Sequence, residues 1–195
     1  MRQRAVSLRV WPWHLPSAAW WVLGIAVGTA ALAVAAHIRV AVPFSPVPIT
    51  LQTLVVIMLG FVSGRRALAA IMLYLVLGAC GLPVFAGGVG GGALVGPTGG
   101  YLIGFIPGAA AAAWGYRRGV VVRTVAGAAG LALIYGCGLV HLAYVWRMGW
   151  AAAWTAGAVP FLAGDIAKLA IAVVGAGGLR KLRGIWLSYL GGGAL

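Results

Sequence analysis

Six apolar segments, separated by short polar or basic stretches, constrain this chain more than any other feature of its sequence. We place the segments at about residues 18–38, 50–63, 67–82, 101–116, 120–145 and 160–179. Only 8% of the residues are charged, against roughly 25% in a soluble domain. A chain this apolar cannot cover its surface with polar groups, so lipid must be part of its solvent. The sequence therefore predicts an all-α integral membrane protein, a bundle of six transmembrane helices.

The basic residues alternate between the loops as the positive-inside rule predicts. Eleven of the 14 Lys and Arg residues flank the segments on one side, and Arg39 and Arg147 lie on the other. We therefore expect a multi-pass protein of the cytoplasmic membrane with both termini in the cytoplasm. A cytoplasmic N-terminal segment, a membrane domain and a C-terminal tail are expected at residues 1–17, 18–183 and 184–195. The first apolar run, of about 21 residues, exceeds the ~7–15 of a signal peptide, so we expect it to be retained.

The composition argues against several function classes. The net charge of +13 comes from clusters in loops, not from one basic stripe, so nucleic-acid binding is not expected. A chain with a single acidic residue lacks the magnesium carboxylates of a self-contained ATPase, and its serines have no nucleophile-elbow motif around them. The two cysteines and three histidines show no metal-ligand spacing. We expect no catalytic activity, no metal and no cofactor.

Two uncharged loops are expected on the outer side, and their composition is unusual for loops of a membrane protein because they are mostly apolar and rich in proline or glycine. Residues 42–53 contain three prolines within six residues, which exclude helix and favour extended backbone. Residues 81–100 are rich in glycine, which lets a backbone approach a ligand closely. Non-helical backbone at membrane depth is tolerated where it is buried in protein or lines a cavity. We therefore expect re-entrant or lid-like loops, the alternatives being a rigid connector and a flexible surface loop.

Asp165 is the only acidic residue of the chain, and Lys168 follows it by three residues within the last apolar segment. Residues three apart share one face of a helix. An ionisable residue inside a membrane span marks a functional site by default, although a self-neutralising structural ion pair is the alternative. We expect this pair to lie one to two turns in from the outer side.

Four segments resemble the BioY family, the biotin-specific substrate-capture subunits (S components) of energy-coupling-factor (ECF) transporters. In the family's order, they are residues 46–54, 81–88, 96–104 and 159–168. The resemblance implies a six-helix fold that binds one biotin near the outer face, closed by the two outer loops. It also implies partners: biotin, the lipid bilayer, a transmembrane coupling protein and cytoplasmic ATPase subunits; the residues leave open whether the chain forms an oligomer.

The ligand chemistry fits these segments. Biotin carries a carboxylate, a ureido ring and an apolar body, so its pocket needs a cation, an acceptor and an apolar wall. Either Lys168 meets the carboxylate and Asp165 accepts a ureido N–H, or Lys168 donates to the ureido oxygen. The other expected substrate-binding residues are Phe44, Gln52, Thr53, Phe85, Gly87, Gly88, Thr98, Gly99 and Tyr101.

Two other function classes stay open on the sequence. One is a stand-alone secondary carrier for biotin or another small anionic vitamin, and the other is a membrane scaffold that assembles through small-residue faces. Small residues recur at four-residue spacing in the first apolar segment, as in Gly24 and Gly28, and such spacing lets a second helix approach closely. Several such pairs compete there, so the surface for a coupling partner is not defined.

Overall fold

The computed structural model describes the backbone of residues 17–191 and the side chains of residues 18–182. The expected N-terminal segment therefore lies outside the described residues except for Ser17. The structure is 76% helical, in agreement with the expected all-α class. Its elements are α1 (Ser17–His37), β1 (Arg39–Val40), β2 (Ile49–Thr50), α2 (Gln52–Ser63), the 3-10 turn η1 (Gly64–Arg66), α3 (Ala67–Ala79), α4 (Gly92–Val95), α5 (Gly99–Trp114), α6 (Val120–Val140), the π-helical turn η2 (His141–Val145), α7 (Trp150–Gly157) and α8 (Val159–Gly191).

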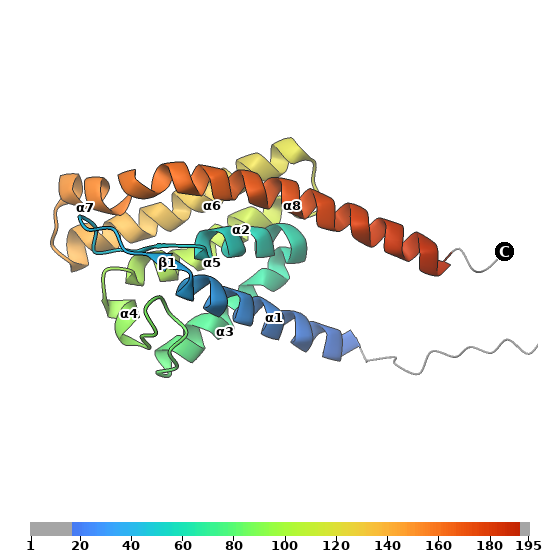
Figure 1. Ribbon diagram of the computed structural model, residues 1–195, viewed down its shortest axis with the longest axis horizontal. Coiled ribbons are helices and arrows are strands. Elements are labelled where there is room, and N and C mark those ends of the chain that lie inside the picture. The colour runs from blue at the N-terminus through green and yellow to red at the C-terminus, as the bar shows by residue number, and fades with distance from the viewer. Residues whose placement is uncertain (1–16, 192–195) are drawn as a thin grey trace, which may run out of the picture.

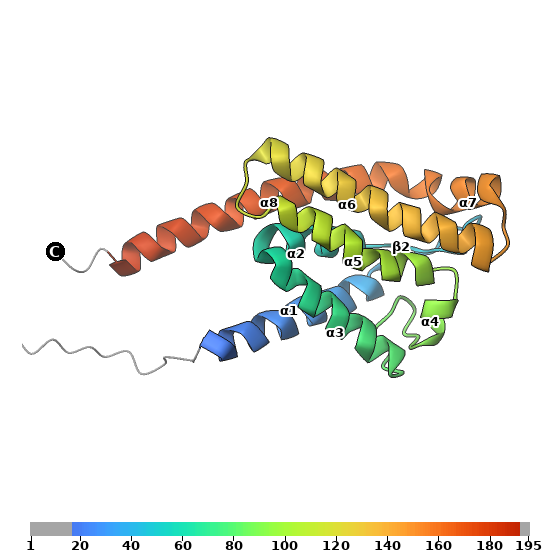
Figure 2. The ribbon, with the colours of Figure 1, turned by 180° about the vertical axis from the view of Figure 1, so that it is seen from behind.

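Four helical stretches are long and apolar enough to cross a membrane. They are Ala18–His37, Gln52–Ala79, Val120–Val145 and Val159–Leu182. The second stretch runs through η1, where Gly64 adopts φ 59°, a conformation that glycine reaches without strain. The chain turns there, so that α3 runs back towards the end at which α2 begins (Figures 1 and 2). The chain is thus a multi-pass membrane protein.

Helices α5 and α6 pack against each other through glycines. A Cβ atom at Gly130 of α6 would lie 2.6 Å from the carbonyl oxygen of Gly108 on α5. Only a residue without a side chain fits there, so the two backbones are in direct contact, as small residues allow between membrane helices. Helix α2 packs against both α5 and α8, and α1 packs on α3 (Figure 1).

The two loops singled out in the sequence lie at the same end of the bundle. Strand β1, which precedes the proline-rich loop, pairs antiparallel with β2 near the loop's end, so residues 49–50 are extended and the residues between the strands form non-helical turns. In the glycine-rich loop, Gly81, Gly87 and Gly88 adopt positive φ, and α4 forms a single turn. Helix α1 begins and α8 ends at the opposite end (Figure 1).

Helix α8 is longer than the sequence analysis expected. The last apolar segment was expected to end at about residue 179, and a tail was expected from residue 184. Instead the helix continues to Gly191. The segment after residue 179 carries Arg180, Lys181 and Arg183, so its hydropathy falls although its backbone stays helical.

Candidate functional site

Asp165 and Lys168 form an ion pair on α8. The Lys168 Nζ lies 2.7 Å from Asp165 Oδ1, and both residues are buried, with 9% and 4% of their surface exposed. This geometry confirms the expectation that the two side chains share one face of a helix. Two charges buried in a membrane span are tolerable because each neutralises the other.

Lys168 also binds the segment that precedes and begins α2. Its Nζ donates to the Thr50 carbonyl oxygen at 2.7 Å and to the Thr53 hydroxyl at 3.3 Å. An ammonium group has three donors, and together with Asp165 all three are used. The Thr53 hydroxyl in turn donates to Asp165 Oδ1 at 2.9 Å. The proline-rich loop brings these groups to α8 because β2 ends at Thr50 and α2 begins two residues later.

Tyr135 supplies the remaining partner of the carboxylate. Its hydroxyl, on α6, donates to Asp165 Oδ2 at 2.5 Å. The carboxylate therefore accepts hydrogen bonds from Thr53, Lys168 and Tyr135, and three helices meet at one buried charge. Such a network holds each group in one orientation because every polar atom has a partner. We refer to these four side chains as the Asp165 network.

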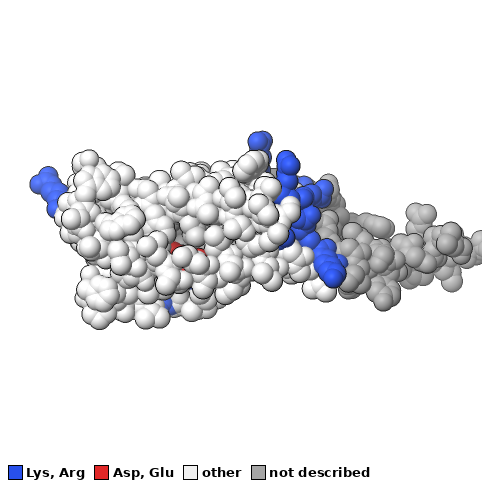
Figure 3. All heavy atoms as spheres, turned by 90° about the horizontal axis from the view of Figure 1, so that it is seen from above, with Lys and Arg blue, Asp and Glu red and all other residues white. Residues whose placement is uncertain are grey.

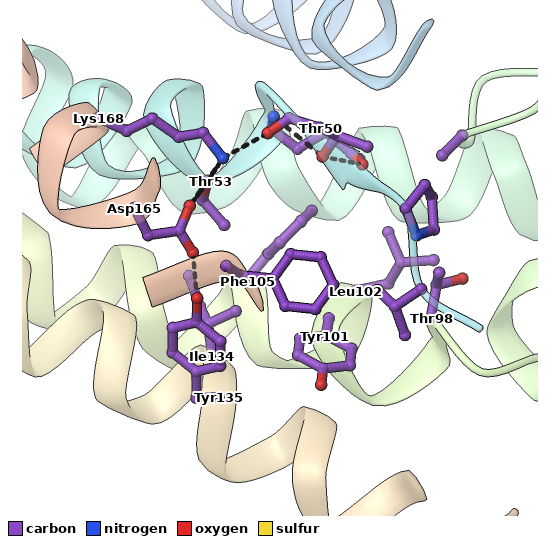
Figure 4. A pocket seen from close by; sticks show the side chains of 15 residues that line it. Thr50, Thr53, Thr98, Tyr101, Leu102, Phe105, Ile134, Tyr135, Asp165 and Lys168 are labelled. Atoms are coloured by element: carbon purple, nitrogen blue, oxygen red, sulfur yellow. Dashed lines mark hydrogen bonds and ion pairs between the residues drawn. The ribbon is translucent and has the colours of Figure 1, made fainter. Parts of the chain in front are cut away.

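A small cavity of about 60 Å³, with an open mouth, lies beside this network (Figure 4). Both outer loops and α2, α5, α6 and α8 contribute to it. The lining residues are Val47, Pro48, Thr50, Gln52, Thr53, Ala86, Thr98, Tyr101, Leu102, Phe105, Ile134, Tyr135, Phe161, Asp165 and Lys168. The charged pair lies on one side, and apolar and aromatic side chains form most of the remaining wall, so the cavity suits a mainly apolar ligand with one polar end.

A second, almost wholly apolar groove of about 480 Å³ runs between α6, α7 and α8. Tyr135 and Asp165 line both the groove and the cavity. Figure 3 shows the only described carboxylate at the bottom of a hollow on this face. The Tyr135–Asp165 hydrogen bond is therefore part of the partition between the cavity and the outer surface of the bundle.

The family model for BioY matches residues 12–184. The chain belongs to the BioY family. A probable biotin transporter BioY of Pyrococcus horikoshii is 44% identical over 138 residues, which cover 70% of this chain and 82% of that protein. A biotin transporter BioY of Thermotoga maritima is 40% identical over 154 residues, covering 73% and 86%.

The fold matches that of a solved structure. A crystal structure described as the S-component for biotin from an ECF-type ABC transporter matches with a TM-score of 0.76. The match covers 84% of this chain and 92% of that chain, at 23% sequence identity. At this identity the likeness establishes the fold, and the chemistry of the site has to be argued from the side chains of this BioY chain.

Six of the eleven expected site residues line the cavity of this BioY protein. They are Gln52, Thr53, Thr98, Tyr101, Asp165 and Lys168. The other five do not line it. They are Phe44, Phe85, Gly87, Gly88 and Gly99.

The two phenylalanines are displaced in opposite directions. Phe44 lies at the tip of its loop and is 71% exposed. Phe85 is fully buried, and its ring packs edge-on against Tyr74 with 5.2 Å between ring centroids. Tyr74 accepts a hydrogen bond from Gln52 and donates one to the Val84 carbonyl. Phe85 therefore anchors the glycine-rich loop to α3 and does not form the wall of the cavity.

The glycines that do not line the cavity shape the backbone around it. Gly87 and Gly88 form a turn with φ 90° and 70°, and the neighbouring Ala86 reaches the cavity in their place. Gly99 begins α5, where a Cβ atom would collide with the Leu94 carbonyl group. All three are positions at which any side chain would be strained or excluded.

Sequence reasoning missed part of the cavity. The residues not named as site candidates are Val47, Pro48, Thr50, Ala86, Leu102, Phe105, Ile134, Tyr135 and Phe161. Tyr135 carried a signal that could have identified it, because a tyrosine in the middle of a span lies far from the interfaces where tyrosine serves as an anchor. Phe105 and Ile134 carried none, since apolar residues occupy every face of their helices.

Proposed function

We propose that this protein captures biotin in the cavity beside the Asp165 network and serves as the S component of an ECF-type transporter. The observation that carries this proposal is a cavity that has one neutral pair of charges on one side and an apolar, aromatic wall opposite. The relatives named as biotin transporters support the choice of ligand. Capture is binding without bond chemistry, so no residue is assigned a catalytic role.

The ureido ring is the part of biotin that we place at the Asp165 network. An acceptor and a donor lie side by side there, and a ureido edge offers the complementary N–H and carbonyl groups. The pair is already neutral, and a ureido ring leaves the buried net charge at zero. A carboxylate placed there would add an uncompensated buried charge, which costs several kcal/mol, on the order of the effective penalty per buried ion. The carboxylate of biotin then points towards the outer loops. The rings of Tyr101, Phe105 and Phe161 contact the bicyclic part of the ligand.

We also propose six membrane crossings, by α1, α2, α3, α5, α6 and α8, with both chain ends in the cytoplasm. The alternation of basic loops supports this arrangement, as does the turn of the chain at η1. Cysteine labelling tests it in a background where Cys80 and Cys137 are replaced by alanine. Gly119→Cys should react only from the cytoplasmic side, and Met148→Cys only from the outside. Labelling of both from one side would contradict the arrangement.

Calorimetry on the purified protein with biotin tests the ligand. We expect saturable one-to-one binding; its absence in protein shown to be folded would refute capture of biotin. Uptake into proteoliposomes, with and without the coupling protein and ATPase subunits, tests the transport role. We expect ATP-dependent uptake with the partners. Equal uptake without them would instead indicate a stand-alone carrier.

A further inference from the structure

Arg123 is a cation buried near the end of the bundle opposite the cavity. It lies in the first turn of α6, and 8% of its surface is exposed. Its Nη1 donates to the Val173 carbonyl oxygen of α8 at 2.7 Å. Its Nε is buried and has no hydrogen-bond partner among the described residues. An unpartnered donor on a buried charge is uncommon because it costs free energy in the folded state.

Helix α8 is shaped to receive this guanidinium group. A Cβ atom at Gly177 would lie 3.2 Å from both Nη1 and Nη2 of Arg123. The glycine therefore lets the group lie flat against the backbone of α8, one turn beyond Val173. This close contact fixes the position of the positive charge between α6 and α8.

The chain offers no side-chain anion to balance this charge. Its single acidic residue is Asp165, which is bound to Lys168. Asp165 lies eight residues before Val173, about 12 Å along the axis of α8 at 1.5 Å per residue. A buried charge without a counter-ion is strongly unfavourable, so an anion supplied by another molecule would stabilise this part of the bundle.

A second arginine lies beside the first. Arg180 is on α8, one turn beyond Gly177. It is close enough to Arg123 for the two positive charges to repel each other. Its Nη1 donates to the Arg118 carbonyl oxygen at 2.8 Å, which ties α8 to the loop before α6. Figure 3 shows the basic side chains gathered at this end of the molecule. Arg123 and Arg180, each bound to a backbone carbonyl and without an acidic side chain to pair with, form an incomplete site, which we call the arginine site.

We propose that the arginine site binds the phosphate group of an anionic phospholipid. Guanidinium groups form paired hydrogen bonds with phosphate oxygens, and basic pockets between membrane helices recognise lipid headgroups. The depth of the site supports a lipid. Trp114 ends α5 at this end of the bundle and is 63% exposed, as expected of an aromatic residue at headgroup level. The lipid phosphate supplies the counter-ion that the chain lacks, and its acyl chains lie along α6 and α8.

Lipid binding to the purified full-length protein tests this inference without biotin, so its outcome is independent of the transport proposal. Native mass spectrometry would measure the affinity for phosphatidylglycerol and for phosphatidylcholine of matched acyl chains. We expect phosphatidylglycerol to bind at least about tenfold more tightly, because only its headgroup has net negative charge. Equal affinities would overturn the proposal and leave an acidic segment of a partner protein as the source of the anion.

Three variants locate the site. Arg180→Gln and Arg123→Gln should each lose at least about fivefold in affinity for phosphatidylglycerol, whereas Lys181→Gln should change it less than about twofold. Lys181 is the matched control because it neighbours Arg180 and is exposed. Should Arg123→Gln not fold, Arg180→Gln decides, since its side chain lies at the surface. Equal losses in Arg180→Gln and Lys181→Gln would indicate general attraction to a basic surface and refute a site.

Inorganic phosphate distinguishes a lipid from a free anion. The melting temperature of the detergent-solubilised protein would be followed with phosphatidylglycerol and, separately, with millimolar inorganic phosphate. We expect the lipid to raise it and phosphate alone to leave it nearly unchanged. An equal rise with phosphate would overturn the lipid as the occupant.

Discussion

The Tyr135 hydroxyl on α6 donates a hydrogen bond to Asp165 Oδ2 on α8, while Lys168 and Thr53 occupy Oδ1. The carboxylate is therefore fully oriented by groups of the protein itself. A site held in one orientation binds tightly because little has to be ordered on binding. A polar ligand bound there must share these hydrogen bonds with the protein. Substitutions in the Asp165 network can therefore show how much the network contributes to stability and how much to ligand binding.

The ion pair gives the first prediction. We expect Lys168→Ala and Asp165→Asn each to weaken biotin binding more than tenfold, at least about 1.4 kcal/mol, since each removes one of the groups facing the ureido edge. Calorimetry measures the change. Gly164→Ala is the matched control on α8, because a Cβ atom there meets nothing within 4 Å. Unchanged affinity in both variants would contradict the site.

A double substitution separates this role from a purely structural ion pair. We expect Asp165→Leu combined with Lys168→Met to fold, because replacing both members of a buried pair by apolar residues is often neutral. The same protein should bind no biotin. Retention of biotin binding in the double variant would mean that the pair only holds the bundle together.

Tyr135 gives the second prediction. We expect Tyr135→Phe to destabilise the ligand-free protein by about 1–3 kcal/mol, because Asp165 Oδ2 is left without a donor. Saturating biotin should reduce the difference in stability between the variant and the wild type, since a ureido N–H can donate to the vacant Asp165 Oδ2. Thermal unfolding with and without biotin measures both effects. Tyr144→Phe is the control, because Tyr144 is 66% exposed. A gap that biotin leaves unchanged would argue against ureido contact with Asp165.

The sequence predicted those parts of the molecule that depend on local composition. Apolar segments report their own burial in lipid, so the first five expected segments lie close to helices of the structure, and α8 begins where expected although it ends later. The Asp165–Lys168 pair was predictable because charges are rare within spans and its spacing fixes a shared face. The absence of helix from residues 42–51 followed from the three prolines of the segment.

The inward or outward direction of loop side chains was not predictable. Phe44 and Phe85 both lie in uncharged, mostly apolar loops, yet one is exposed and the other fully buried. What distinguishes them is the surface of α3, where Tyr74 packs against Phe85 and Gly78 leaves room for its ring. The same limit hid Tyr135, whose partner is 30 residues away on another helix. Tertiary contacts of this kind leave no periodic pattern in a single sequence.

This contrast between the phenylalanines gives the third prediction. We expect Phe85→Ala to destabilise the protein by roughly 3 kcal/mol or more and to free the glycine-rich loop, because it removes a fully buried ring. Phe44→Ala should change stability by less than about 0.5 kcal/mol, as exposed substitutions usually do. Hydrogen exchange of residues 81–98, together with thermal unfolding, measures both. Equal effects of the two substitutions would contradict the anchoring role of Phe85.

Ligand analogues give the fourth prediction. With the ureido ring at the Asp165 network, biotin amide, which lacks the negative charge, should bind within about tenfold of biotin. An analogue methylated on both ureido nitrogens should lose at least about a hundredfold, because it leaves buried acceptors unpaired. Competition against labelled biotin measures both. The opposite ranking would place the carboxylate at Lys168.

The close packing of α5 on α6 gives the fifth prediction. Gly130→Ala would put a Cβ atom 2.6 Å from the Gly108 carbonyl oxygen and 2.8 Å from Ile57, so the helices must separate. Overpacking of this kind typically costs about 1–3 kcal/mol, and it would also shift Ile134 in the cavity wall. Gly136→Ala makes the same change on the same helix where nothing lies within 4 Å. We expect thermal unfolding to show a loss of stability for Gly130→Ala and none for Gly136→Ala. We also expect Gly130→Ala to bind biotin more weakly. Equal stability of both variants would mean that α5 and α6 do not depend on direct backbone contact at this crossing.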